Sequence, residues 1–271
     1  MMSDRIDLSF LDCPELLEII FPVVYSPFNF PDYLQSPSTA VAIHSIEVEE
    51  GIKIGCGFWA IGKEYPSVLY FHGNGETVAG HDWIAPFYNQ RRINLFVTDY
   101  RGYGSSNGKP TISNMLGDAH TIFKGFREII RQEGFNNSLF LMGRSLGSMP
   151  AIELAFHYQD EIHGLIIESG TSNNFRHILS YLVITGAEAI LEEESLFLNK
   201  IKIKQVRRPT LIIHGEYDEI IPVEEGKELY QNSGAQDKEV IIIPRAGHND
   251  IMMVNQTLYF DRIEKFVKAY S

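Results

Sequence analysis

The sequence predicts an α/β protein whose largely parallel sheet is covered by helices on both faces. Six short runs rich in Val, Ile, Leu and Phe alternate with longer, helix-like runs. The short runs show little polar alternation, as expected of strands that are buried on both faces. Strands that alternate with helices along a chain form parallel sheets. A serine flanked by glycines, Ser145, lies at one of the predicted strand-to-helix turns.

The predicted elements can be placed in order from residue 42 onward. A hairpin comes first, with strands over Ala42–Glu49 and Ile52–Ile61 around the turn at Glu50-Gly51. The later strands are predicted at Ser67–Phe71, Asn94–Thr98, Ser138–Met142, His163–Glu168, Thr210–His214 and Glu239–Ile243. Helices are predicted at Val78–Arg92, Ile112–Glu133, Ser148–Tyr158, Val223–Asn232 and Ile251–Tyr270.

Two segments lie outside this alternation. Residues 1–41 carry repeated prolines among aromatic residues, which predicts an irregular arm that packs on the body. Residues 170–208 form an interval too long for a simple crossover. We interpret this interval as a small helical cap, with helices over Phe175–Ile184 and Ala187–Leu198, and a plain surface excursion is the alternative. We expect residues 1–271 to form one domain.

Composition and charge narrow the class of function. The chain has 35 acidic and 23 basic residues, a net charge of −12, which argues against nucleic-acid partners and against stable association with anionic membranes. No signal peptide is visible, and no run approaches the roughly 18 apolar residues of a membrane span. The two cysteines, Cys13 and Cys56, show no metal-ligand spacing. We therefore expect a soluble cytoplasmic protein without a metal or cofactor.

The strongest functional motif is Gly143-Arg-Ser145-Leu-Gly147, between a predicted strand and a predicted helix. A serine at such a tight turn has a strained backbone, and flanking glycines avoid collisions with the neighbouring strand and helix. The turn lifts the hydroxyl above the sheet and directs the next backbone N–H to the same point in space. Ser145 is therefore the candidate nucleophile, and Leu146 supplies a candidate oxyanion donor.

A serine hydroxyl becomes a good nucleophile only with a base in hydrogen-bond reach and a carboxylate that orients the base. In such a sheet the functional loops meet at the carboxyl ends of the strands. His248 directly follows the last predicted strand and is the predicted base. Asp218 follows the penultimate strand and is the predicted acid. Glu168, at the end of the strand after the serine helix, is its rival, and Glu216 and Glu219 are weaker alternatives.

The remaining histidines are expected to have other roles. His214 is predicted to pack at a strand end, and His72 belongs to a separate glycine-rich motif. The others lie on predicted strand, helix or cap faces and are interpreted as structural or solvated: His44, His81, His120, His157, His163 and His177.

A second oxyanion donor is predicted in the loop His72-Gly-Asn74-Gly-Glu76, which follows the strand Ser67–Phe71. Glycines let a backbone approach a bound carbonyl closely, so the N–H of Asn74 is the candidate, with a purely structural turn as the alternative. The segment Asp99-Tyr-Arg-Gly-Tyr-Gly after the next strand is interpreted as mainly structural, with Asp99 paired to Arg101. Arg144 is interpreted as a lock for the serine turn and not as a catalyst.

Taken together, these motifs resemble the α/β-hydrolase superfamily. Their order spans nearly the whole chain from residue 42: His72-Gly-Asn-Gly, Asp99-Tyr-Arg-Gly-Tyr-Gly-x-Ser, Gly143-Arg-Ser-Leu-Gly, Gly215-x-x-Asp-x-x-Ile-Pro and Gly247-His. Within the superfamily the chain is similar to the serine aminopeptidase and monoglyceride lipase-like branch. It most resembles small ABHD and Bem46-type serine hydrolases and related protein depalmitoylases. The resemblance implies an eight-stranded, mostly parallel sheet with an antiparallel second strand.

The resemblance also implies an activity and its residues. Ser145 would be the nucleophile, His248 the base and Asp218 the acid, with Asn74 and Leu146 as oxyanion donors. We expect hydrolysis of a small-molecule carboxylic ester, with thioesters and amides as further candidates. Acyl transfer by the same triad and a purely binding scaffold remain alternatives. The chain has Arg144 where many relatives have His or Gln, and it shows no anchor or cysteine cluster at its N-terminus, which argues against a membrane-protein substrate.

Overall fold

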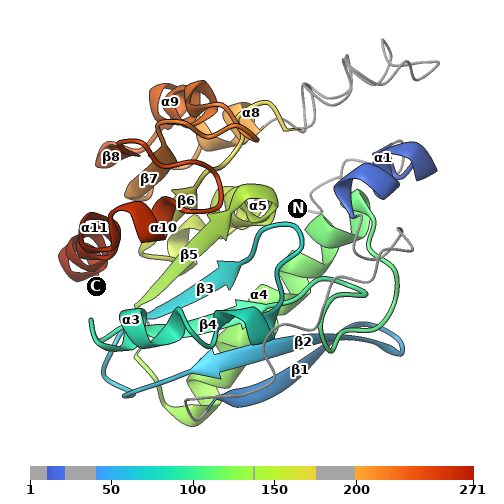
Figure 1. Cartoon of the computed structure of the whole chain (residues 1–271). Coiled ribbons are helices and arrows are strands. Elements are labelled where there is room, and N and C mark those ends of the chain that lie inside the picture. Colours follow the sequence, from blue (N-terminus) through green and yellow to red (C-terminus); the bar gives the residue numbers. More distant parts are fainter. Residues whose placement is uncertain (1–10, 22–40, 137, 175–198) are drawn as a thin grey trace.

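The computed structural model describes residues 11–21, 41–136, 138–174 and 199–271. Its centre is an eight-stranded sheet in the order β1-β2-β4-β3-β5-β6-β7-β8 (Figure 1). The strands are β1 (Ala42–Glu49), β2 (Ile52–Trp59), β3 (Ser67–Phe71), β4 (Asn94–Thr98), β5 (Leu139–Arg144), β6 (Gly164–Glu168), β7 (Thr210–Gly215) and β8 (Lys238–Ile243). Strand β2 runs antiparallel to both of its neighbours, and the other pairings are parallel. The predicted fold class is confirmed, with strand ends within two residues of those expected.

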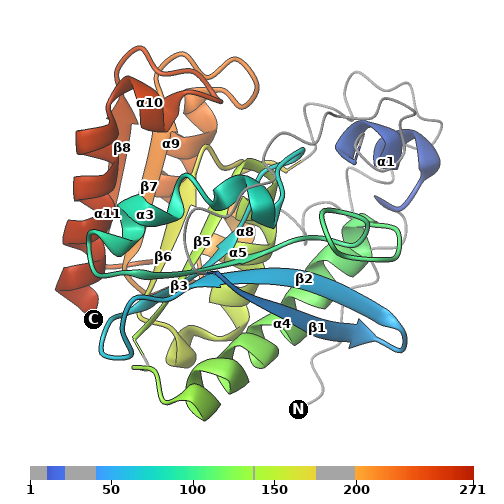
Figure 2. The same cartoon turned by 60° about the horizontal axis from the view of Figure 1, so that its bottom comes forward.

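Helices cover the sheet on both faces (Figure 2). One face packs against α4 (Ile112–Glu133), α5 (Ser148–His157), α8 (Asn199–Ile203) and α9 (Val223–Asn232). The other packs against a 3₁₀ turn, η2 (Val78–His81), and helices α3 (Ala85–Asn89), α10 (Ile251–Val254) and α11 (Gln256–Tyr270). The inner strands β3 to β7 are buried along their whole length, because both of their faces are covered.

Two predicted helices are interrupted. The one expected over Val78–Arg92 is divided into η2 and α3, and Pro86 stands in the first turn of α3, where a missing N–H is tolerated. The one expected over Ile251–Tyr270 breaks at Asn255, whose backbone is not helical (φ −148°, ψ 73°). The Asn255 side chain accepts the N–H of Leu258 and so begins α11.

The prediction of an irregular N-terminal arm is wrong for residues 14–20, which form a helix. This helix, α1 (Pro14–Ile20), begins at a proline and buries Leu16, Leu17 and Ile20 against the body. The two predicted cap helices fall in residues 175–198, outside the described residues. At the end of the same interval α8 packs on α5 and α9. In the described part of the chain no helix has both the length and the hydropathy of a bilayer span.

Candidate active site

The turn after β5 places Ser145 at the carboxyl end of the sheet with a left-handed backbone (φ 52°). Both glycines of the motif are required by the tight approach of backbone segments. A Cβ on Gly143 would lie 2.2 Å from the carbonyl oxygen of Gly147, and one on Gly147 would lie 2.0 Å from that of Phe71. Real Cβ atoms do not approach so closely, so the strained serine is held between two positions that only glycine can fill.

The structure brings Ser145, His248 and Asp218 together, although they lie in three loops. The Nε2 of His248 is 2.9 Å from Ser145 Oγ, and its Nδ1 is 2.8 and 2.9 Å from the two carboxylate oxygens of Asp218. Each of these residues is less than a tenth exposed. When Nδ1–H donates to the carboxylate, the Nε2 lone pair faces the serine hydroxyl, which is the arrangement that a general base requires.

Further contacts hold the Asp218 carboxylate in place. Its Oδ1 accepts the N–H groups of Ile220 at 3.0 Å and Ile221 at 2.8 Å, and its Oδ2 is 3.3 Å from Nε2 of His214. Burial alone would raise the pKa of Asp218, but hydrogen bonds from His214 and His248 outweigh burial and lower that pKa below its usual range. The carboxylate is therefore an anion at neutral pH. The contact with His214 was missed by the sequence reasoning, which predicted only packing for this residue.

The rival acid, Glu168, points to other partners. Its carboxylate accepts from Arg144 Nε at 3.2 Å and from the Tyr259 hydroxyl at 2.5 Å, and it is fully buried. Burial raises the pKa of Glu168. No hydrogen bond joins it to His248 among the described residues. The geometry thus favours Asp218 as the partner of the imidazole.

The glycine-rich loop after β3 is braced by the segment that follows β4. Asp99 contacts His72 Nε2 at 3.2 Å and accepts the N–H of Val78 at 2.7 Å. The Tyr100 hydroxyl donates to the carbonyl of His72 at 2.6 Å. In addition, the Tyr103 hydroxyl donates to Asn74 Oδ1 at 2.8 Å. This segment therefore positions the loop that carries the candidate oxyanion donor.

The predicted pairing of Asp99 with Arg101 is wrong. The Arg101 guanidinium instead donates to Asp118 at 2.7 and 2.8 Å and to Glu49 at 2.8 Å. Residues two apart in a turn point in different directions, so Asp99 faces inward to His72 while Arg101 crosses to α4 and the end of β1.

Arg144 joins several loops beneath the site. Its guanidinium donates to the carbonyl of His248 at 2.8 Å, to Asn249 Oδ1 at 3.1 Å and to Glu168, and it also pairs with Glu76. Glu76 in turn accepts the N–H of Gly73 at 3.2 Å, in the glycine-rich loop. Arg144 thus contacts more than the serine turn, and its contact with the histidine loop could not be predicted because the partner is a backbone carbonyl.

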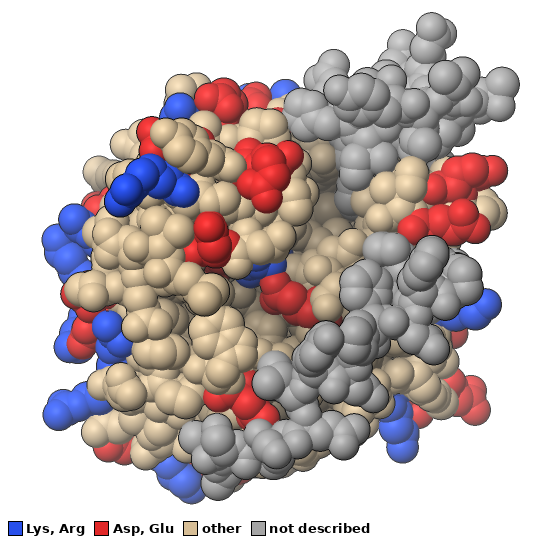
Figure 3. Space-filling view, viewed as in Figure 1, with Lys and Arg blue, Asp and Glu red and all other residues tan. Residues whose placement is uncertain are grey.

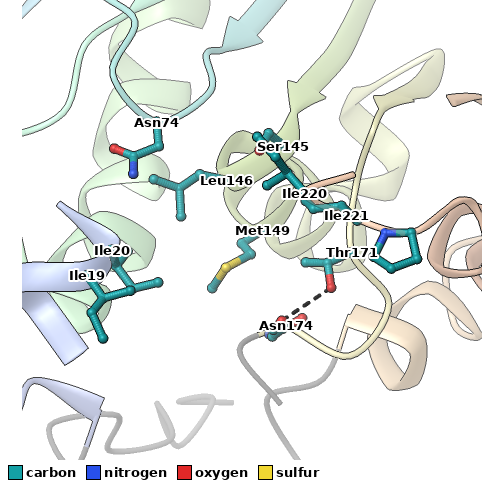
Figure 4. Close-up of a pocket in the computed structure, with 11 residues that line it drawn as sticks. Ile19, Ile20, Asn74, Ser145, Leu146, Met149, Thr171, Asn174, Ile220 and Ile221 are labelled. Atoms are coloured by element: carbon teal, nitrogen blue, oxygen red, sulfur yellow. Dashed lines mark hydrogen bonds between the residues drawn. The ribbon is translucent and has the colours of Figure 1, made fainter. Parts of the chain in front are cut away.

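A cavity of about 240 Å³ opens at Ser145, between α1 and the loop after β7 (Figure 4). Leu146 and Met149 lie between Ile19 and Ile20 on one side and the loop after β7 on the other. The lining is mostly apolar and includes both candidate oxyanion residues, Asn74 and Leu146. The full set of lining residues is Ile19, Ile20, Asn74, Ser145, Leu146, Met149, Thr171, Asn174, Ile220, Ile221 and Pro222. Over the described part of the face in Figure 3, acidic and basic side chains are scattered around a central hollow. The cavity can hold an apolar group next to the serine.

Comparisons with known proteins agree with this architecture. The family model described as serine aminopeptidase, S33, matches residues 63–191 and 197–252. Alpha/beta hydrolase domain-containing protein 17C of Xenopus tropicalis is 30% identical over 241 residues, which cover 87% of this chain and 72% of that protein. Alpha/beta hydrolase domain-containing protein 17B of Homo sapiens is 28% identical over 242 residues, covering 87% and 78%.

Solved structures share the fold at lower sequence identity. The esterase Pf2001 of Pyrococcus furiosus superposes with a TM-score of 0.72 at 18% identity, over 90% of this chain and 99% of that one. Est1E of Butyrivibrio proteoclasticus, solved with bound ferulic acid, gives a TM-score of 0.70 at 17% identity, over 84% and 98%.

Proposed function

Because this chain belongs to the serine aminopeptidase S33 family of α/β-hydrolases, we propose that it hydrolyses carboxylic esters through Ser145, His248 and Asp218. The observation that carries the proposal is the continuous contact from Ser145 Oγ to His248 Nε2 (2.9 Å) and from His248 Nδ1 to Asp218 (2.8 Å). Both distances lie in the range of functional hydrogen bonds between nucleophile, base and orienting acid.

The proposed reaction proceeds in two halves. Ser145 Oγ attacks the ester carbonyl carbon while its proton passes to His248 Nε2, and the N–H groups of Asn74 and Leu146 stabilise the resulting oxyanion. The bond from the carbonyl carbon to the alcohol oxygen then breaks, and the imidazolium gives its proton to the leaving oxygen. Water next attacks the acyl-enzyme and gives a proton to His248. The carboxylic acid leaves as Ser145 recovers its proton.

The cavity supports an ester with an apolar acyl group. Its lining near Ser145 is mainly aliphatic, so burying the acyl group is favourable by about 25 cal/mol per Å² of apolar surface. The anionic Asp218 lies behind His248 and stabilises the imidazolium that forms in each half-reaction. Thioesters offer the same carbonyl to the same groups and are the second substrate class to be tested.

The test compares the wild type with Ser145→Ala and with Ser45→Ala, a control at an exposed serine on β1. Purified proteins are assayed with p-nitrophenyl esters from acetyl to palmitoyl and with a fluorophosphonate probe, with mass spectrometry to locate the label. We expect activity and labelling to vanish in Ser145→Ala and to persist in Ser45→Ala. Undiminished hydrolysis by Ser145→Ala, or a folded wild type that is never labelled at Ser145, would contradict the proposal and favour a binding role.

A further inference from the structure

We propose that His120, Glu153 and His157 form a binding site for Zn²⁺ on the surface between α4 and α5. The three residues come from two helices, and Glu153 and His157 are four apart on α5, so they lie on the same face of that helix. None of them lines the cavity at Ser145. The inference is therefore independent of the proposed hydrolase activity.

The spacing of the ligand atoms fits a tetrahedral ion. Glu153 Oε1 lies 3.4 Å from His120 Nε2 and 3.1 Å from His157 Nε2. Ligands about 2.0–2.1 Å from a tetrahedral zinc ion are separated from one another by about 3.3–3.4 Å. One ligand atom of each residue lies within 4.8 Å of the others. Small side-chain rotations would therefore bring all three around a single ion.

The surroundings hold these ligands in position. The His120 ring has its second nitrogen, Nδ1, 3.0 Å from the hydroxyl of Tyr158. Lys202 from α8 pairs with Oε2 of Glu153 at 2.5 Å and leaves Oε1 turned towards the two imidazoles. Metal-bound histidines commonly carry such a partner on the other ring nitrogen, and metal-bound carboxylates are commonly hydrogen-bonded through the free oxygen.

The donor set selects the class of metal. Two imidazoles and one carboxylate suit zinc, whereas calcium and magnesium prefer sites made of oxygen alone. The His157 side chain is 33% exposed, which leaves a side of the cluster open to a water molecule as fourth ligand.

The experiment is a calorimetric titration of the full chain with ZnCl₂, repeated with Co²⁺, whose visible absorption reports tetrahedral coordination. The variants are His120→Ala and His157→Ala, and the matched control is His44→Ala, a partly buried histidine of β1. His248→Ala is included because the active site also offers imidazole and carboxylate groups. Thermal midpoints measured without metal show whether each variant is folded.

We expect saturable binding of about one zinc per chain, a tetrahedral cobalt spectrum and a higher thermal midpoint with zinc. Affinity should fall on the order of tenfold or more in His120→Ala and His157→Ala, because each loses one ligand, and should stay within about twofold in His44→Ala and His248→Ala. No saturable binding by the folded wild type would overturn the proposal and leave the cluster as an ion-pair network. An unchanged affinity in both folded ligand variants, or loss of binding in His248→Ala, would overturn it as well.

Discussion

Replacing Arg144 by lysine should slow ester hydrolysis while preserving the charge beneath the site. The Arg144 fork donates at the same time to the His248 carbonyl, to Asn249 and to Glu168. A lysine ammonium is a point charge and cannot reproduce this planar set of donors. We therefore expect the backbone at His248 to lose its anchor, and the imidazole above it to be positioned less accurately against Ser145.

The structure sets the size of the effect. A hydrogen bond to a charged group is worth about 1.5–3 kcal/mol, and about 1.4 kcal/mol corresponds to a tenfold change in rate. If the hydrogen bond from Arg144 to the His248 carbonyl is lost and its whole free energy is added to the activation barrier, kcat falls about 10- to 150-fold. KM should change little, because Arg144 does not line the cavity.

A methionine at the same position tests the charge. Arg144 is only 6% exposed and pairs with Glu76 and Glu168, so Arg144→Met leaves two carboxylates without their cation. Breaking a buried pair in this way costs about 3–5 kcal/mol of folding stability. Adding Glu168→Gln to Arg144→Met should recover part of that loss, which a double-mutant cycle of urea unfolding would measure.

The assay determines kcat and KM for a p-nitrophenyl ester from pH 5 to pH 9, with thermal midpoints for every variant. Arg91→Lys is the matched control, since Arg91 also pairs with carboxylates, those of Asp261 and Glu264, but contacts no residue of the site. Its kcat should stay within about twofold of the wild type, as for surface changes in general. An Arg144→Lys variant with the kcat of the wild type across the pH range would refute the positioning role.

Gly147→Ala should prevent folding to the native state, because the new Cβ would collide with the backbone of Phe71, and the yield of soluble protein measures this. Gly117→Ala, inside α4 with open space at the new Cβ, should instead add about 1 kcal/mol to the free energy of unfolding, which urea unfolding measures. The pKa of Asp218 is lower in the folded than in the unfolded protein, so the ionised carboxylate stabilises the fold above the unfolded pKa of about 4. This stabilisation is lost progressively as the pH falls through and below that value. The difference in thermal midpoint between the wild type and Asp218→Asn should therefore narrow from pH 7 to pH 3. Tyr103→Phe removes the 2.8 Å hydrogen bond to Asn74, so kcat should fall about 2- to 10-fold. A kcat equal to that of the wild type would count against a role of this hydrogen bond in positioning the loop that carries Asn74.

Most of the sheet and the three candidate triad positions were readable from the sequence because each depends on local chemistry. Helix α4 was predicted with its observed ends, which a Thr111 capping box and a left-handed Gly134 fix within a few residues of chain. Asp218 and His248 could be predicted as candidates because each follows a strand, and the carboxyl ends of parallel strands share one edge of the sheet.

Most of the contacts that the sequence did not reveal join segments far apart in the chain, although the contact of His214 with Asp218 spans only four residues. The contacts of Arg144 with Glu76 and with the carbonyl of His248 depend on how β5 packs beside the loops after β3 and β8. No pattern in the sequence marks Glu76 or a backbone carbonyl as a partner of Arg144. The pairing of Asp99 was wrongly predicted because closeness in sequence was taken for closeness in space. In the same way α1 depends on burial of Leu16 and Leu17 against the body, which its many neighbouring prolines concealed.

Asp218 and Glu168, the two candidates for the orienting acid, differ in their contacts and in the direction of their pKa shifts. Asp218 accepts two backbone N–H groups and contacts two imidazoles, and its pKa is lowered, so it is an anion where His248 needs one. Glu168 is fully buried and its pKa is raised, while its oxygens are engaged by Arg144 and Tyr259. Environments that drive two acids apart in this way assign them different tasks. In the proposed mechanism Asp218 orients the imidazole, whereas Glu168 binds the guanidinium of Arg144, which in turn donates to the carbonyl of His248.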